Sequence, residues 1–281
     1  MTRRAGGEGM GTPKPHASAP RKRFGQHFLT DPRILDRIAD AVGIAPGDTV
    51  VEIGPGRGGL TEKLASRVGP AGRLIAVEVD RDLALLLRAR YADRPEVTIH
   101  EGDILTTDVP ALAGGRFLLV GNIPYNITTP ILFHALAAPR ADRMVFMIQR
   151  EVAERLVAPP GGEEYGALSA NAQALATIEV VFRVPAGAFS PPPKVDSAVI
   201  RVVPRATPDV APAEEEAFRA LVQGLFSFRR KQMVRAVRNV CRVSAADSAA
   251  LLERAGIRAM DRPEVLAPAD FARLLRAKAR P

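Results

Sequence analysis

The chain of 281 residues has only one cysteine, Cys241. One cysteine excludes a disulfide framework or a cysteine-based zinc site within the chain, and it fits a reducing compartment such as the cytoplasm. The four histidines are scattered without metal-ligand spacing, so we predict no metal site. No apolar run approaches the roughly 20 residues that a membrane-spanning helix needs. The N-terminal arginines are not followed by the apolar segment of a secretory signal, and we expect no membrane partner.

Acidic residues are too few to balance the basic ones. The 31 aspartates and glutamates stand against 39 lysines and arginines, which gives a net charge of +8 and a pI near 10.2. A basic chain suggests a polyanionic partner, nucleic acid before membrane, although a generally arginine-rich composition would give the same balance. The hydrophobic content of 47% predicts a folded chain with a substantial core.

Short apolar runs alternate with helical patterns through the first two thirds of the chain. We expect strands at 49–53, 74–79, 97–100, 117–120 and 143–149, with helices at 60–68, 83–91 and 130–137. This alternation predicts an α/β fold with a parallel sheet covered on both faces. The runs at 178–182 and 197–203 are not separated by a long helix, which suggests an antiparallel pair at one edge.

The composition changes near residue 204. Residues 204–212 are rich in proline and alanine and are typical of a linker. The pattern beyond them is helical and begins with an acidic turn, which favours a helix start. We therefore expect a disordered basic tail over 1–20, an α/β domain over 21–204 and a small all-helical domain over 205–281.

A glycine-rich turn follows the first expected strand. Gly54, Gly56 and Gly59 match G-x-G-x-x-G, which lets the backbone approach a ligand and offers free N–H groups at a helix start. Glu78 ends the second strand, where a carboxylate can accept both ribose hydroxyls. The pattern predicts a nucleoside cofactor without choosing NAD over S-adenosylmethionine. A tight turn that binds nothing is the alternative.

An acidic residue, Asp103, follows the third strand. A carboxylate at this position can reach the exocyclic amine of the adenine of the cofactor, although a lone aspartate here more often caps a helix. Three successive strand ends therefore carry ligand-binding residue types. The ligand crevice of an open α/β sheet lies at those ends.

The fourth strand ends in the sequence GNIPYN, residues 121–126. The Asn122 side-chain oxygen and the Ile123 carbonyl, held extended because Pro124 follows it, can accept hydrogen bonds from an exocyclic amine. The Tyr125 ring can stack on the same base. Such a site would methylate an amine by positioning and polarisation, with no general base needed for the attack. The alternative is a proline turn that merely ends a strand.

These motifs together resemble the ribosomal RNA adenine N6,N6-dimethyltransferases, specifically the branch that dimethylates two adjacent adenosines near the 3′ end of small-subunit rRNA. The resemblance covers nearly the whole chain beyond the first 20 or so residues. The matching segments are 23–29, 51–59, 77–80, 102–104, 122–125, 189–199 and 228–231. The strings Asn-Ile-Pro-Tyr and Pro-Lys-Val-Asp-Ser are the most specific of them.

The resemblance implies a Rossmann-like class I methyltransferase domain with S-adenosylmethionine as cofactor and S-adenosylhomocysteine as product. It also implies a cytoplasmic enzyme, which we expect to be a monomer, that acts on rRNA within the 30S particle or its precursor and takes part in ribosome maturation. Phe189 would pack on the target base opposite Tyr125, as a flipped base requires. The implied cofactor-binding set is Gln26, His27, Leu29, Gly54, Gly56, Glu78, Asp103, Ile104 and Asn122.

No acidic residue occurs between Ala217 and Ala246, and this region carries the nucleic-acid prediction. Lys231, Arg235, Arg238 and Arg242 would share one face of a continuous helix. A one-signed face suits a phosphate backbone, whereas solvated faces normally mix signs. The predicted RNA-binding residues are Arg229, Arg230, Lys231, Arg235, Arg238 and Arg242.

Three alternatives remain open at this point. A nicotinamide dehydrogenase shares the glycine turn and Glu78, but it needs neither Asn-Ile-Pro-Tyr nor a one-signed helix. Related enzymes dimethylate a large-subunit adenosine and confer macrolide resistance, whereas the basic triplet at 229–231 favours the small-subunit branch. A non-catalytic assembly factor would have no need of Asn122, Tyr125 and Asp103.

Overall fold

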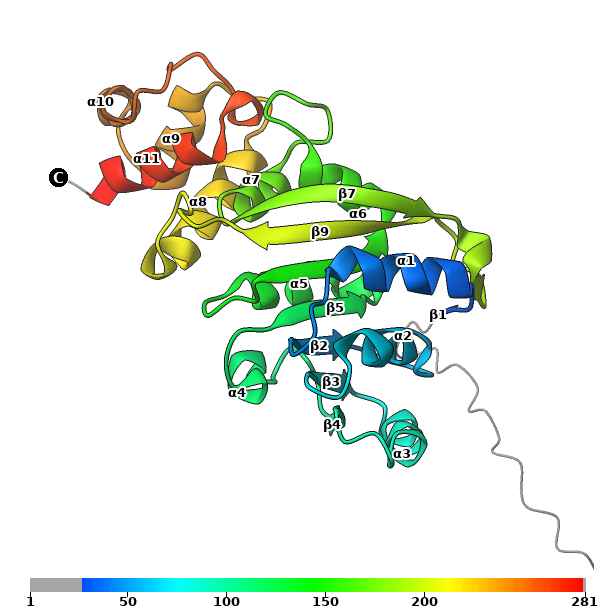
Figure 1. The fold of residues 1–281 in the computed structure, drawn as a ribbon. Helices are drawn as coiled ribbons and strands as arrows, with labels where there is room; N and C mark the ends of the chain where they lie inside the picture. The colour runs from blue at the N-terminus through cyan, green and yellow to red at the C-terminus, as the bar shows by residue number, and fades with distance from the viewer. Residues whose placement is uncertain (1–26, 280–281) are drawn as a thin grey trace, which may run out of the picture.

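The computed structural model describes residues 27–279, so Gln26 and the predicted tail lie outside the described residues. Its centre is a seven-stranded sheet in the order β4-β3-β2-β5-β6-β9-β7 (Figure 1). The strands are β2 (Thr49–Ile53), β3 (Arg73–Glu78), β4 (Val97–Glu101), β5 (Leu118–Asn122), β6 (Arg143–Gln149), β7 (Ala176–Val184) and β9 (Ser197–Pro204). Strands β2 to β6 are parallel, while β9 is antiparallel to both β6 and β7. The predicted parallel sheet with an antiparallel edge is confirmed.

Helices cover both faces of the sheet. One face carries α1 (Pro32–Val42), α2 (Gly59–Val68) and α3 (Arg81–Arg90), and the other carries α4 (Val109–Ala113), α5 (Thr128–Leu136), α6 (Arg150–Val157) and α7 (Ala167–Gln173). Successive side chains of β2 divide between them, because Val50 belongs to the first cluster and Val51 to the second. Both valines are fully buried, which explains why the strand reads as an unbroken apolar run.

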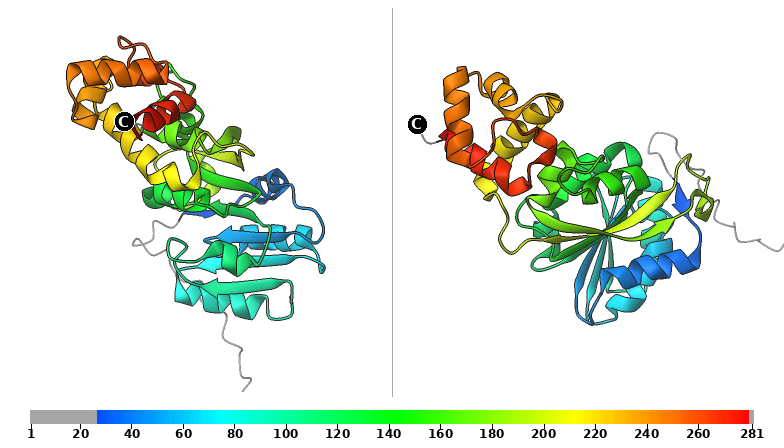
Figure 2. Two further views of the ribbon diagram at one scale, coloured as in Figure 1. Left: turned by 90° about the vertical axis from the view of Figure 1, so that its left-hand side faces the viewer. Right: turned by 90° about the horizontal axis from the view of Figure 1, so that it is seen from above.

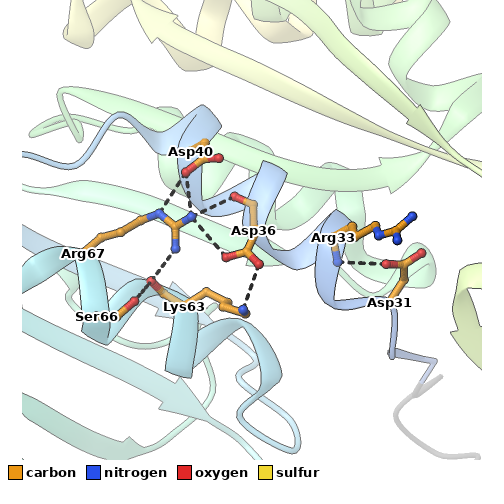
Figure 3. Close-up of polar contacts among 7 residues, drawn as sticks. All are labelled: Asp31, Arg33, Asp36, Asp40, Lys63, Ser66 and Arg67. Atoms are coloured by element: carbon orange, nitrogen blue, oxygen red, sulfur yellow. Dashed lines mark hydrogen bonds and ion pairs between the residues drawn. The ribbon is translucent and has the colours of Figure 1, made fainter.

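Charged side chains join α1 to α2 on this first face (Figure 3). Lys63 donates to Asp36 at 2.8 Å, and the Arg67 guanidinium reaches Asp36 at 3.2 Å and Asp40 at 2.6 Å. These pairs are partly exposed, so each contributes little to stability alone. The N-terminus of α1 is capped by Asp31, whose carboxylate accepts the Arg33 N–H. The start of α1 is therefore held in place, and with it the segment 27–30 that leads into the helix.

Four helices follow the sheet: α8 (Glu215–Ser227), α9 (Met233–Cys241), α10 (Ala245–Ala255) and α11 (Pro268–Ala279). Figure 2 shows them gathered beside α6 and α7 at one end of the molecule. Aromatic rings make the junction, since Phe226 lies 5.9 Å from Tyr165 and 5.8 Å from Phe271, measured between ring centroids. The Tyr165 hydroxyl also donates to the Leu266 carbonyl at 2.9 Å. The buried side chains of these helices belong to the same core cluster as the second face of the sheet.

The segment expected to be a linker, 204–212, is packed against this junction. Arg205 and Asp209 donate backbone hydrogen bonds to the carbonyls of Leu175 and Ala174, and Val210 is buried. The division of the chain into two domains at this segment stays a prediction.

The continuous basic helix face expected from Lys231 to Arg242 is wrong. Helix α9 spans only Met233–Cys241, because Gln232 is extended and Arg242 adopts the left-handed conformation with φ of 56°. The first N–H groups of the helix, those of Met233 and Val234, are bound by the carbonyls of Asp261 and Ala259. The helix therefore begins at Met233 because the loop at 259–261 binds these N–H groups.

No described helix is long and apolar enough to cross a membrane.

Candidate active site

A cavity of about 250 Å³ opens at the carboxyl edge of the sheet, where β2, β3 and β5 end. The segment 27–30, which precedes α1, forms one of its walls. The predicted residues that line the cavity are His27, Leu29, Gly54, Gly56, Glu78, Asn122, Ile123, Pro124 and Tyr125. Three motifs that are far apart in the sequence therefore meet in one place.

The glycine turn after β2 has the backbone geometry that its sequence predicts. Gly54 and Gly56 have φ of 63° and 57°, a left-handed conformation that other residues rarely adopt. A side chain on Gly56 would also meet the Phe28 ring at 3.0 Å. The Gly56 N–H donates to the Glu78 carboxylate at 2.9 Å, and the other Glu78 oxygen accepts the Asp80 N–H at 2.9 Å. Burial raises the pKa of Glu78, although these bonds favour its ionised form.

A second carboxyl, Glu52, lines the cavity and was missed by the sequence reasoning. It is only 1% exposed, and burial raises its pKa to about 8. Thr61 lies near enough to lower this pKa in part, yet Glu52 Oε2 and Thr61 Oγ1 have no hydrogen-bond partner among the described residues. The available signal was a glutamate among the apolar residues Val50, Val51 and Ile53, one residue before the end of the strand.

The acidic side chains of the cavity fit a positively charged nucleoside. Two buried carboxyls, Glu52 and Glu78, line one cavity, and the Glu52 oxygen without a partner costs free energy unless a ligand binds to it. S-adenosylmethionine carries an ammonium and a sulfonium, so its charge complements this wall. Among the described residues no group of three or more potential ligands could hold a metal ion.

Asn122 and Ile123 present two acceptors at the end of β5. Asn122 Nδ2 donates to the His27 carbonyl at 3.2 Å. This bond assigns the nitrogen to that side of the amide and leaves the oxygen on the opposite side. The Ile123 N–H donates to the Met147 carbonyl of β6 at 3.0 Å, which fixes the peptide between Asn122 and Ile123. The Ile123 carbonyl belongs to the next peptide, and Pro124 restricts its conformation. No described hydrogen bond reaches Asn122 Oδ1 or the Ile123 carbonyl oxygen. Both residues line the cavity, and that these two oxygens bind a ligand there stays a prediction.

Tyr125 begins a single 3₁₀ turn, Tyr125–Ile127, between β5 and α5. Its ring is half-buried, with a centroid 6.1 Å from that of His27 and an angle of 24° between the two planes. The Tyr125 hydroxyl lies 2.6 Å from the Ser197 hydroxyl, and burial raises its pKa. His27 is held in turn by a contact of 2.9 Å between its Nδ1 and the Pro191 carbonyl.

Three predicted residues are not brought into the cavity. Phe189 is 4% exposed and lies in β8 (Phe189–Ser190), paired with Leu29 of β1 (Phe28–Leu29). Asp103 is exposed, and its carboxylate accepts the Leu105 N–H at 3.0 Å. Ile104 lines a second cavity of about 390 Å³ between α4 and α5. The roles assigned to these three residues stay predictions.

The predicted RNA-binding residues differ in how they are partnered. Arg229 forms an ion pair with Glu264 at 2.7 Å and donates to the Glu163 carbonyl. The other five, which we call the basic segment, are exposed, and no described acidic residue forms an ion pair with any of them. They are Arg230, Lys231, Arg235, Arg238 and Arg242.

The chain is similar to rRNA-modifying proteins over most of its length. The family model described as "Ribosomal RNA adenine dimethylase" matches residues 17–279. The "Ribosomal RNA small subunit methyltransferase A" of Xanthomonas campestris pv. campestris is 45% identical over 261 residues, which span 92% of this chain and 96% of that protein.

Two solved structures are also similar to this chain. The dimethyladenosine transferase from Plasmodium falciparum superposes with a TM-score of 0.76 at 27% identity, covering 88% of this chain and 96% of that one. The 23S rRNA methyltransferase ErmE superposes with a TM-score of 0.68 at 29% identity, covering 90% of this chain and all of that one.

Proposed function

Because the chain belongs to the ribosomal RNA adenine dimethylase family, we propose that it transfers methyl groups from S-adenosylmethionine to N6 of two adjacent adenosines near the 3′ end of small-subunit rRNA. Transfer to rRNA adenine with this cofactor is the activity of the family. The small-subunit substrate is supported by relatives such as the 45%-identical protein of Xanthomonas campestris, whose name states it.

The observation that carries the proposal is the pair of acceptors at Asn122 and Ile123 in the cavity wall. The N6 lone pair of adenine is delocalised into the ring, so the amine is a poor nucleophile. Two acceptors that bind its N–H groups favour a more pyramidal nitrogen with an available lone pair. The bond to His27 orients the Asn122 amide, and Pro124 restricts the Ile123 carbonyl, so little reorganisation is needed during the reaction.

S-adenosylmethionine, when bound, supplies an electrophilic methyl group. Glu78 and Gly56 would hold its ribose and methionine portions, and Glu52 would face its positive charge. Tyr125 would hold the flipped base by stacking, which fixes the distance between the amine and the methyl carbon. After each methyl transfer the cationic N6 loses one proton to solvent, so two transfers to one adenine remove both amine protons and Asn122 needs no base character.

In this proposal the basic segment binds the RNA substrate. Its five exposed cations suit the phosphates of a folded rRNA, and their binding would depend strongly on salt. We infer that the substrate is the small-subunit particle or its precursor, met in the cytoplasm by a monomeric enzyme that also contributes to ribosome maturation. Residues 205–281 form the RNA-binding part of this assignment.

A second candidate substrate is a large-subunit adenosine, which the similarity to ErmE favours. The two are separated by incubating the protein and tritiated S-adenosylmethionine with undermethylated small subunits or with large-subunit rRNA in parallel. We expect label in the small-subunit RNA alone. Label in the large-subunit RNA alone would overturn the small-subunit assignment, and label in neither would overturn the proposed activity.

A further inference from the structure

The Tyr125 ring is tethered by a residue outside the motif that contains it. Its hydroxyl lies 2.6 Å from Ser197 Oγ, a short distance for two hydroxyl groups. Ser197 is fully buried, whereas Tyr125 lies on the cavity wall. The tyrosine hydroxyl therefore faces away from the solvent side of the cavity and into the edge of the sheet.

The backbone of Ser197 is paired with a neighbouring strand on each side. Ser197 is the first residue of β9 and pairs with Gln149 of β6 on one side and Val184 of β7 on the other. A side chain on such a doubly paired strand is placed more reproducibly than one on a loop. Tyr125, by contrast, starts a single 3₁₀ turn. The antiparallel strand thus supplies the rigidity that the turn lacks.

The same short segment also holds the ring that faces Tyr125. The Pro191 carbonyl contacts His27 Nδ1 at 2.9 Å, and the His27 ring lies roughly parallel to that of Tyr125. Residues 191–197 therefore hold two rings by two separate polar contacts. This arrangement lets the start of β9, far from β5 in the sequence, hold the cavity wall that contains Tyr125.

We infer that Ser197 is a positioning residue for the reaction, and that the Tyr125 hydroxyl is the tether through which it acts. This inference rests on the proposed function, because it assigns the Tyr125 ring to the target base. The hydroxyl is engaged by Ser197 and takes no part in moving protons at the reacting amine. Its loss and the loss of Ser197 therefore remove the same interaction.

Three variants test the tether: Ser197→Ala, Tyr125→Phe and the double variant. Each single change should lower kcat on undermethylated small subunits about 5- to 30-fold, the range expected for one hydrogen bond that orients a reacting group. The double variant should be no slower than either single variant, because only one interaction is lost. The affinity of the three variants for S-adenosylhomocysteine, measured by calorimetry, should stay within about twofold of the wild type. Ser190→Ala, which changes an exposed serine nearby, should have the kcat of the wild type.

A spectroscopic signal separates positioning from a merely structural role. The chain has only three tyrosines, so labelling with ¹³Cζ-tyrosine gives three signals, and Tyr125→Phe assigns one of them. Ser197→Ala should shift the Tyr125 signal and leave those of Tyr91 and Tyr165 in place. An unshifted Tyr125 signal, an unchanged kcat, or effects of the two single changes that multiply would each overturn the inference. Failure of the proposed function would appear separately, as an inactive wild type.

Discussion

The cavity at the carboxyl edge of the sheet and the basic segment around α9 differ in how their polar side chains are partnered. In the cavity Glu78, Asn122 and Tyr125 each make a hydrogen bond to another element, at 2.9, 3.2 and 2.6 Å. In the basic segment all five cations are exposed and form no ion pair with a described residue. Fixed side chains suit a reaction whose atoms must be closely placed, whereas flexible cations suit attraction to phosphates. Mutations should therefore separate chemistry from RNA affinity.

The largest separation is expected for Asn122→Ala, which removes one of the two acceptors. Methyl transfer should fall by about 10²- to 10³-fold, the range for a group that stabilises charge only in the transition state. Binding of the small subunit should survive, because the basic segment is untouched. Single-turnover transfer of tritiated methyl groups measures the first effect and filter binding the second. Asn126→Ala, at an exposed position of the same turn, is the matched control. Unchanged turnover in Asn122→Ala would contradict the polarisation mechanism.

Tyr125 should show a smaller loss that depends on which part of the side chain is removed. Tyr125→Ala eliminates the ring and should reduce turnover by about 10- to 100-fold, given roughly 1–3 kcal/mol per stacked base. Tyr125→Phe keeps the ring and loses only its tether, so it should be the more active of the two. Equal turnover of both variants at saturating small subunit would remove the stacking role.

The basic segment should behave in the opposite way. Arg235→Ala combined with Arg238→Ala should weaken small-subunit binding by about tenfold. The slope of log affinity against log salt concentration should become shallower by about 2, one for each lost phosphate contact. Calorimetry should find S-adenosylhomocysteine affinity unchanged. Arg116→Ala combined with Arg258→Ala removes the same charge from residues already paired with acids, and serves as the control. An equal loss of binding in both pairs would mean that net charge, and not this segment, captures RNA.

The smallest effect concerns pH and Glu52. Burial raises the pKa of this carboxyl to about 8 in the cofactor-free protein. The positive charge of S-adenosylmethionine favours the ionised form of Glu52, so its binding between pH 6 and 8 should release a proton, and its affinity should rise by about three- to tenfold across that range. The enthalpy of binding should depend on the buffer for the wild type and less so for Glu52→Gln. A wild-type affinity independent of pH would contradict this assignment.

The same pKa predicts the pH dependence of stability, with a definite sign. Because the pKa of Glu52 is higher in the folded state than in the unfolded chain, its contribution to stability is fully present below pH 4.5 and is lost as pH rises through about 8. The melting temperature of the wild type should therefore fall over this range relative to Glu52→Gln. Comparison with that variant also cancels the contribution of Glu78, whose pKa is raised by burial as well.

The sequence predicted the sheet and the cavity better than the basic segment, for a physical reason. Strands such as β2 and β6 are buried on both faces, so each appears in the sequence as a short apolar run. Glycines with positive φ have few substitutes, so the glycine pattern itself predicts the turn. The strands β1 and β8 are two residues long and pair across the whole domain, and no local pattern reports such a pairing. The tether of Ser197 was equally invisible, because it joins residues 72 positions apart.

Two other differences have the same cause. Helix α9 was expected to extend from Lys231, but backbone bonds from the loop at 259–261 start it at Met233. The contact between the His27 and Tyr125 rings was not expected either, and it joins two segments far apart in the sequence. Each depends on contacts between distant segments, and neither propensity nor spacing within one segment contains that information.

The most direct test of the account is mass spectrometry of rRNA fragments from undermethylated small subunits incubated with the protein and S-adenosylmethionine. We expect N6,N6-dimethyladenosine at two adjacent positions near the 3′ end of the small-subunit RNA, and far less of it after the same time with Asn122→Ala. Methyl groups on a different atom or nucleotide, or an equal yield from Asn122→Ala, would contradict it.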